Sequence, residues 1–293
     1  MRVRRYRVLH RTIYVYSDVV SSSYGRAYLT PREFPGQRLR SHDVRIDPVP
    51  SDRSVGADVY GNTTLYFHVT AEHRRLEVTG ESMVEVTSRL PPPDSVSWEQ
   101  ARPGIENGPL AVEFTMDLNP PELNPEIAAY AAESFPPGRP LLEAVTELTA
   151  RIYTDFTYKS GSTTVSTRVA DVFIARKGVC QDFARLALAC LRSQGLAARY
   201  VSGYLATNPP PGKPRLIGAD ATHAWATVWL PAGSGDGHWI DFDPTNNKFA
   251  DERYVTLAWG RDYADVPPVR GIIYTDAKES TITVSVDVAP VEV

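Results

Sequence analysis

The chain has 293 residues, of which 42% are hydrophobic and 23% are charged, with a formal net charge of −4. This composition is typical of a folded globular protein and excludes a disordered or low-complexity one. The slightly acidic balance gives no electrostatic footprint for nucleic acid, so no nucleic-acid partner is expected.

Residues 1–90 are predicted to form a β-rich N-terminal domain. Residues 1–16 are basic and then alternate between apolar and polar types, which indicates a strand and lacks the apolar core of a signal peptide. Short strand patterns continue at residues 43–46, 64–69 and 76–86. The longest apolar run near a functional-looking residue is far shorter than the ~18 residues that span a bilayer. We therefore expect a cytoplasmic protein with no membrane partner.

Residues 91–138 are predicted to be a connector, because they are rich in proline, glutamate and asparagine. A short helix is expected within it, at about residues 126–134. Residues 139–293 are expected to form a second domain that mixes helices and strands. Its predicted elements are a helix after Pro140, a short helix at 169–176, a helix from Cys180 to just before Gly195, strands at 198–205, 222–230 and 238–243, and β alternation at 271–288.

The two cysteines, Cys180 and Cys190, are too few for a disulfide framework in an intracellular chain. Cys180 is predicted at the start of a helix, where free backbone amides and the helix dipole favour a thiolate. Arg176 and Lys177 add positive charge just upstream, and the same amides can stabilise an oxyanion on a substrate carbonyl. The alternative is that Cys180, like Cys190 on the apolar face of that helix, is a small buried apolar residue.

His223 and Asp243 lie on two strands that are predicted to pair as a hairpin. If the turn centres near Gly233, His223 faces Asp243 directly. A slip by two residues places Trp225 opposite Asp243 and leaves His223 diagonal to it. In either register the two side chains share a face, with Cβ atoms roughly 5 to 8 Å apart. Asp241 shares that face too, so either aspartate can orient the imidazole as a base for a thiol nucleophile. The plainer alternative is that His223 is one of the polar residues of an ordinary strand face.

Several segments together resemble the transglutaminase-like superfamily. They are Gly178-Val179-Cys180-Gln181-Asp182-Phe183, Arg199-Tyr200-Val201-Ser202-Gly203-Tyr204, Thr222-His223-Ala224-Trp225 and Asp243-Pro244-Thr245. The resemblance covers essentially the whole chain and is closest to the bacterial branch, in which a β-rich region precedes the core. It implies an α+β fold: an N-terminal antiparallel β domain, followed by a papain/transglutaminase-like core in which the helix carrying the cysteine packs on an antiparallel sheet.

By the same resemblance, Cys180 matches the nucleophile, His223 the general base and acid, and Asp243, in preference to Asp241, the orienting carboxylate. The implied reaction is acyl transfer from an amide through a thioester. Water as acceptor makes a peptidase or deamidase, and an amine makes a transglutaminase. The expected partners are a peptide or protein substrate and an amine acceptor. Trp225 and Tyr204 are predicted to bind substrate, although packing roles fit them as well.

No cofactor or metal is expected. The chain has no acidic loop of the calcium-binding type. A zinc site made of Cys180, His223 and Asp243 would lack a close fourth ligand. Arylamine N-acetyltransferases also use Cys-His-Asp, but the N-terminal region and the segment around Cys180 fit them poorly. The remaining alternative is a catalytically inactive binding or scaffold module. Four histidines of the N-terminal region are interpreted as surface or packing residues: His10, His42, His68 and His73.

Overall fold

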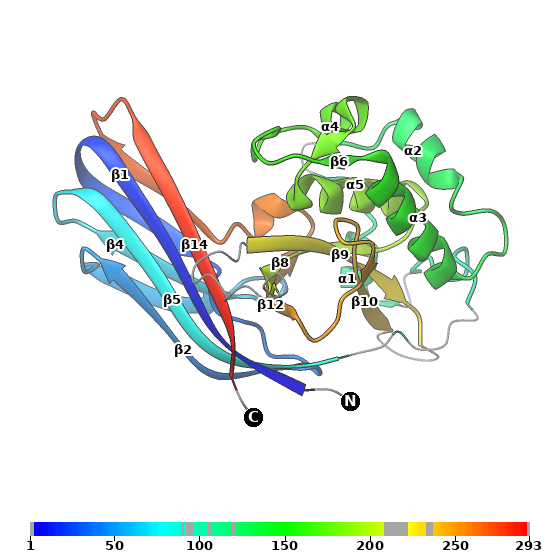
Figure 1. Cartoon of the computed structure of the whole chain (residues 1–293), viewed down its shortest axis with the longest axis horizontal. Helices are drawn as coiled ribbons and strands as arrows, with labels where there is room; N and C mark the ends of the chain where they lie inside the picture. Colours follow the sequence, from blue (N-terminus) through cyan, green and yellow to red (C-terminus); the bar gives the residue numbers. More distant parts are fainter. Residues whose placement is uncertain are drawn as a thin grey trace, which may run out of the picture.

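The computed structural model describes residues 3–88, 91, 96–104, 107–118, 121–207, 222–232 and 237–291. In these residues a large curved sheet lies beside a second unit, in which a smaller sheet is covered by helices (Figure 1). The sheets are antiparallel, as the predicted α+β fold class requires.

The first sheet is built around the long strand β1, which spans Val3–Ala27. Its other N-terminal strands are β2 (Gln37–Asp47), β3 (Asp52–Ala57), β4 (Thr63–Val69) and β5 (His73–Thr87), in the order β2-β5-β1-β4-β3. Alternate side chains of β1 are buried from Tyr6 to Thr12, because successive residues of a strand point to opposite faces. The predicted strands at 43–46, 64–69 and 76–86 are confirmed, whereas β3 was not predicted from the sequence.

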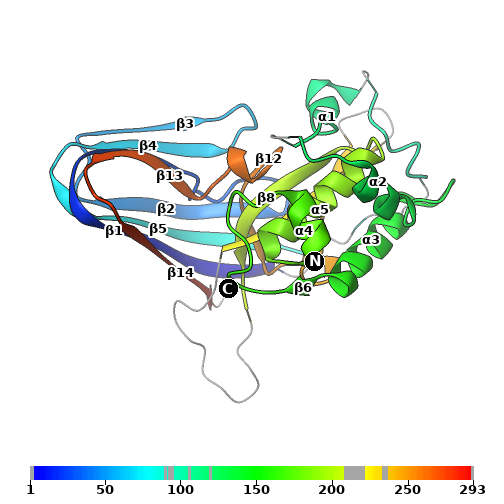
Figure 2. The same ribbon diagram turned by 90° about the horizontal axis from the view of Figure 1, so that it is seen from above.

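The last two strands of the chain return to this first sheet. Strand β13 (Val269–Thr275) and strand β14 (Ser280–Val291) both pair with β1, and β14 follows it from Arg5 opposite Val291 to Tyr16 opposite Ser280 (Figure 2). The sequence predicts that residues 139–293 form one domain. The pairing instead places residues 269–291 with the N-terminal strands, because alternation marks a strand without revealing its partner.

The second sheet has the order β11-β10-β9-β8-β12. Its strands are β8 (Ala198–Leu205), β9 (Thr222–Leu230), β10 (His238–Asp243), β11 (Lys248–Phe249) and β12 (Tyr254–Gly260). The bounds of β8, β9 and β10 agree with the sequence prediction. Strand β12 was not predicted, and it forms the edge beside β8.

Four helices lie on one face of this second sheet (Figure 1). They are α2 (Pro125–Ala132), α3 (Leu141–Asp155), α4 (Val169–Ala175) and α5 (Cys180–Ser193). Helix α5 packs on β8 and β9 and is buried from Asp182 to Arg192, so the helix that carries Cys180 does pack on an antiparallel sheet. The shorter elements are α1 (Pro109–Glu113), η2 (Tyr263–Asp265), β6 (Thr157–Tyr158) and β7 (Lys177–Gly178).

One cluster of buried side chains spans the two units, and the first sheet also has a separate cluster of its own. Tyr6 and Val8 of β1, together with Val286 of β14, belong to the same cluster of buried side chains as the apolar face of α5. The side chain of Gln37 also joins them: its Nε2 donates to the Thr256 carbonyl at 2.7 Å, and its Oε1 accepts from the Thr256 amide at 2.8 Å. The first sheet is therefore packed against the core as a structural part of the molecule.

Candidate active site

Cys180 is held at the first residue of α5 by the turn that precedes it. Asp182 Oδ2 accepts hydrogen bonds from the amide of Val179 at 2.8 Å and from the hydroxyl of Thr163 at 2.6 Å. A Cβ added to Gly178 would lie 2.9 Å from both Cβ and Oδ2 of Asp182, so this close approach requires glycine. The segment from Gly178 to Asp182 thus fixes where the helix begins.

His223, near the start of β9, contacts Asp243 at the end of β10. Its Nε2 lies 2.7 Å from Asp243 Oδ2. Asp243 is completely buried, and the same oxygen accepts from the hydroxyl of Tyr254 at 2.7 Å and from Asn246 Nδ2 at 2.6 Å. Asp243 Oδ1 accepts from the amide of Thr245 at 2.8 Å. These donors hold the carboxylate in one orientation beneath the imidazole.

The register of the β9–β10 hairpin decides between the two aspartates. Asp241 pairs with Thr227 and Phe242 with Ala226, which is the slipped register of the two that the sequence allowed. Asp241 Oδ1 accepts instead from the indole Nε1 of Trp225 at 3.1 Å. Asp243 is therefore the carboxylate that contacts His223.

The electrostatics of the site favour a charged imidazole. Burial opposes the charge on His223, but hydrogen bonds to Asp243 and Cys180 overcome it and raise the pKa of the ring to about 10. Burial also opposes the charge on Asp243, yet its contact with His223 holds the pKa of that carboxyl below its usual value. Cys180 is half-buried, whereas Cys190 is fully buried and burial raises the pKa of its thiol to about 12.

Cys180 and His223 open into one cavity of about 370 Å³. One side of it comes from α5, β8, β9 and the loops around them, and the other from the first sheet. The described residues that line it are His10, Thr12, Tyr14, Tyr158, Val165, Val179, Cys180, Gln181, Tyr200, Ser202, Thr222, His223, Ala224, Tyr263, Pro268, Val269, Ile282 and Val284. Strands β1 and β14 therefore form a wall of the candidate active site.

Trp225 and Tyr204 are not among the described residues that line this cavity. Trp225 lies behind the imidazole of His223, with ring centroids 6.1 Å apart, and borders a separate cavity of about 250 Å³. Tyr204 is buried, and its hydroxyl lies 3.0 Å from Nδ1 of His10. Their positions fit packing roles, and the substrate-binding role given to them by the sequence remains a prediction.

His10, which the sequence predicts to be a surface or packing residue, lines the cavity. Its ring is almost fully buried, and burial lowers its pKa to about 4. The alternation of β1 carries a partial signal, because His10 and Thr12 fall on the same face as the apolar Tyr6 and Val8. What the sequence does not contain is the contact between that face and the cavity of Cys180.

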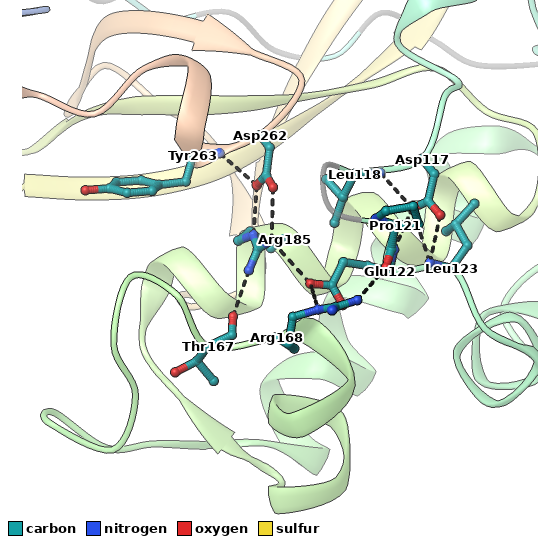
Figure 3. Close-up of polar contacts among 10 residues, drawn as sticks. All are labelled: Asp117, Leu118, Pro121, Glu122, Leu123, Thr167, Arg168, Arg185, Asp262 and Tyr263. Atoms are coloured by element: carbon teal, nitrogen blue, oxygen red, sulfur yellow. Dashed lines mark hydrogen bonds and ion pairs between the residues drawn. The ribbon is translucent and has the colours of Figure 1, made fainter. Parts of the chain in front are cut away.

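A buried ion-pair network supports the cavity from the side of α5 (Figure 3). The guanidinium of Arg185 donates to both carboxylate oxygens of Asp262, at 2.8 and 3.0 Å, and to the carbonyl of Thr167 at 2.9 Å. Asp262 Oδ1 also accepts from the amide of Tyr263 at 2.7 Å, at the start of η2. Because Tyr263 lines the cavity, this network ties one of its walls to the helix that carries Cys180.

In the part of the chain that the structure describes, the His, Cys, Asp and Glu side chains do not gather in any group of three or more that would hold a metal ion. Among the helices that the structure describes, none is long and apolar enough to cross a membrane.

Comparisons with known proteins identify the family. The bacterial transglutaminase-like N-terminal region matches residues 6–85, and the transglutaminase-like superfamily matches residues 128–244. The chain is 59% identical to an uncharacterized protein of Mycobacterium tuberculosis (strain ATCC 25618 / H37Rv), over 98% of this chain and 93% of that one. It is 32% identical to an uncharacterized protein of Mycobacterium leprae, over 92% of each. The chain therefore belongs to the transglutaminase-like superfamily, in its bacterial branch.

The fold has a counterpart among solved structures. The crystal structure of a "putative cysteine protease" from Cytophaga hutchinsonii matches 100% of this chain and 92% of its own, with a TM-score of 0.78 and 19% sequence identity. At that identity the likeness shows the fold alone. The family and the α+β fold class predicted from the sequence are confirmed.

Proposed function

We propose that the protein is a cysteine-dependent enzyme that transfers an acyl group from an amide through a thioester. Cys180 is the nucleophile, His223 the general base and acid, and Asp243 the carboxylate that orients the imidazole. The observation that carries this proposal is the contact of His223 with the buried Asp243, in the same cavity that Cys180 lines from the start of α5. This arrangement supports the assignment, because thiol catalysis needs a nucleophile, a base beside it and a group that orients the base.

In the proposed reaction, the Cys180 thiolate attacks the carbonyl carbon of the amide. A C–S bond forms, and the carbonyl electron pair moves to oxygen, where the free amides of the first turn of α5 can stabilise it. The tetrahedral intermediate collapses by breaking the C–N bond, and the leaving nitrogen takes a proton from His223. His223, now neutral, removes a proton from water or from an amine, whose attack breaks the C–S bond and regenerates the thiolate.

Hydrolysis of a peptide or of a glutamine amide is the outcome we favour, with transamidation as the alternative fate of the same thioester. Both need a peptide or protein as acyl donor, and transamidation also needs an amine acceptor. No cofactor takes part in the proposed steps. The cytoplasm remains the proposed location, in keeping with two free cysteines.

Intact-mass spectrometry of the wild type and of Cys180→Ala tests the proposal. Each protein is incubated with a broad cysteine-peptidase inhibitor and, separately, with a glutamine-containing peptide with and without an amine. We expect a single adduct on the wild type and none on Cys180→Ala, together with cleavage, deamidation or amine incorporation that identifies the reaction. Absence of any adduct on a folded wild type would contradict the proposal and favour an inactive binding module.

A further inference from the structure

The first sheet contributes one wall to the cavity of Cys180. In the pairing of β1 with β14, Thr12 lies opposite Val284 and Tyr14 opposite Ile282. Residues opposite each other in an antiparallel pair, and those two apart along a strand, share a face of the sheet. All four side chains line the cavity. We refer to Thr12, Tyr14, Ile282 and Val284 as the β1–β14 wall.

This wall leaves apolar surface open beside the thiol. Ile282 is 59% exposed and Val284 47% exposed, and Tyr158 and Val165, on the opposite side of the same cavity, are 56% and 64% exposed. Four large apolar side chains thus gather around the mouth of one cavity without being covered by the described residues. Covering such surface with an apolar group is favourable, because it removes apolar area from water.

The part of the cavity that the structure describes has no free ionic partner for a charged substrate group. Among the described residues that line it there is no Asp, Glu, Lys or Arg. Of its two histidines, His223 contacts Asp243 and Cys180. His10 uses both of its ring nitrogens, Nδ1 with the hydroxyl of Tyr204 at 3.0 Å and Nε2 with that of Thr12 at 2.8 Å. A charged side chain bound there would lose its hydration without an ionic partner.

We propose that the β1–β14 wall selects the acyl donor, and that this donor carries an uncharged apolar or aromatic side chain on the acyl side of the scissile amide. The inference rests on the proposed function, because it takes Cys180 to be the nucleophile. It assigns to the N-terminal region a direct part in choosing the substrate.

The test uses four peptidyl vinyl sulfones that differ only in the residue beside the electrophile: phenylalanine, leucine, aspartate or lysine. Rates of adduct formation on Cys180 are measured by intact mass on the full chain. Each rate is divided by the rate with iodoacetamide, which has no amino-acid side chain and therefore measures the reactivity of the thiol alone. We expect the phenylalanine and leucine probes to react at least tenfold faster than the aspartate and lysine probes.

A pair of variants locates the selection. Ile282→Asp places a carboxylate in the wall, so it should lower the ratio of the phenylalanine rate to the lysine rate at least tenfold. Ile272→Asp makes the same change on β13, at a side chain that is 68% exposed and outside the described lining of the cavity, and should leave that ratio unchanged. Because both positions are exposed, both variants are expected to fold.

The outcomes separate this inference from the proposed function. Equal rates for the four probes, or equal ratios in the two variants, would overturn the role of the wall while selective iodoacetamide labelling of Cys180 upheld the nucleophile. If iodoacetamide labelled Cys180 no faster than the buried Cys190, the proposed function would fail and this inference with it.

Discussion

At the scale of single residues, the site depends on a carboxylate that is more heavily bonded than its sequence motif indicates. Asp243 is completely buried and accepts from His223, Tyr254 and Asn246 through one oxygen, and from the amide of Thr245 through the other. A carboxylate held this way cannot turn away from the imidazole, so it fixes both the orientation and the charge of the ring.

Replacing Asp243 with asparagine tests that influence. The neutral amide keeps the shape but cannot stabilise an imidazolium, so the pKa of His223 should fall from about 10 toward its ordinary value. At a pH above the new pKa, each unit by which the pKa falls lowers the fraction of protonated His223 about tenfold. The protonated ring is the form that pairs with the Cys180 thiolate. We expect alkylation of Cys180 by iodoacetamide at pH 7.5, about one unit above the ordinary imidazole pKa, to slow roughly tenfold. The buried Cys190 is the internal control, and an unchanged rate would show that Asp243 does not act on the thiol.

The raised pKa of His223 also predicts how stability depends on pH. A folded-state pKa of about 10, against 6.5 for the ordinary group, means that the unfolded chain releases this proton first as the pH rises. The contribution of His223 is therefore complete below about pH 6.5 and is lost as the pH rises toward 10. Urea unfolding measures the free energy of unfolding at pH 6 and at pH 9.5. Between these two pH values the wild type should lose more of it than His223→Gln does, by on the order of a few kcal/mol. The exposed His238→Gln is the matched control and should behave as the wild type does.

At the scale of elements, α5 is held by the ion pair between Arg185 and Asp262, which are both almost fully buried. Replacing Asp262 with asparagine removes the carboxylate that the guanidinium contacts through two hydrogen bonds, and leaves the buried Glu122, at 3.5 Å, as its remaining anionic partner. This should lower the free energy of unfolding by roughly 3 kcal/mol. The matched control is Asp18→Asn, which breaks the exposed pair with Arg74 and should cost less than about 1 kcal/mol. Urea unfolding measures both losses of unfolding free energy. Equal losses would contradict the expectation that the buried ion pair contributes more to stability than the exposed one.

How much of the fold the sequence predicts differs from element to element. Helix α5 and strands β8, β9 and β10 were predicted correctly, since each has a clear period or a glycine or proline at its ends. Strand β3 is exposed on both faces, so its sequence does not alternate and it was not recognised. Strand β12 is buried on both faces, as β8 and β9 are, and it was not recognised either.

Local signals of this kind do not predict which strands pair or which residues lie close together in the folded chain. The alternation of residues 271–288 predicted strands, but their pairing with β1 joins residues more than 200 positions apart in the chain. The hairpin of His223 and Asp243 was predicted with two registers open, because the intervening turn allows both. For the same reason the sequence could propose Cys180, His223 and Asp243 as a set, yet could not place His10 or Ile282 beside them.

At the scale of the whole molecule, the pairing of β14 with β1 and the shared core predict that the two units unfold together. All five tryptophans lie between residues 98 and 259, so tryptophan fluorescence reports on the second unit, while far-UV circular dichroism also reports on the first sheet. We expect the two signals to change at the same urea concentration. Two separate transitions would show that the shared core does not couple the units.

A buried residue of the first sheet extends this test. Val286 of β14 is 1% exposed and belongs to the core cluster that contains the apolar face of α5. Val286→Ala should therefore destabilise the tryptophan-containing unit as well, by roughly 1 to 3 kcal/mol, and move both transitions together. The matched control is Val291→Ala on the same strand, which removes the same atoms from a side chain that is 36% exposed and should change little. A shift of the circular dichroism transition alone would mean that the first sheet can open while the active-site unit stays folded, and that its wall of the cavity can be withdrawn.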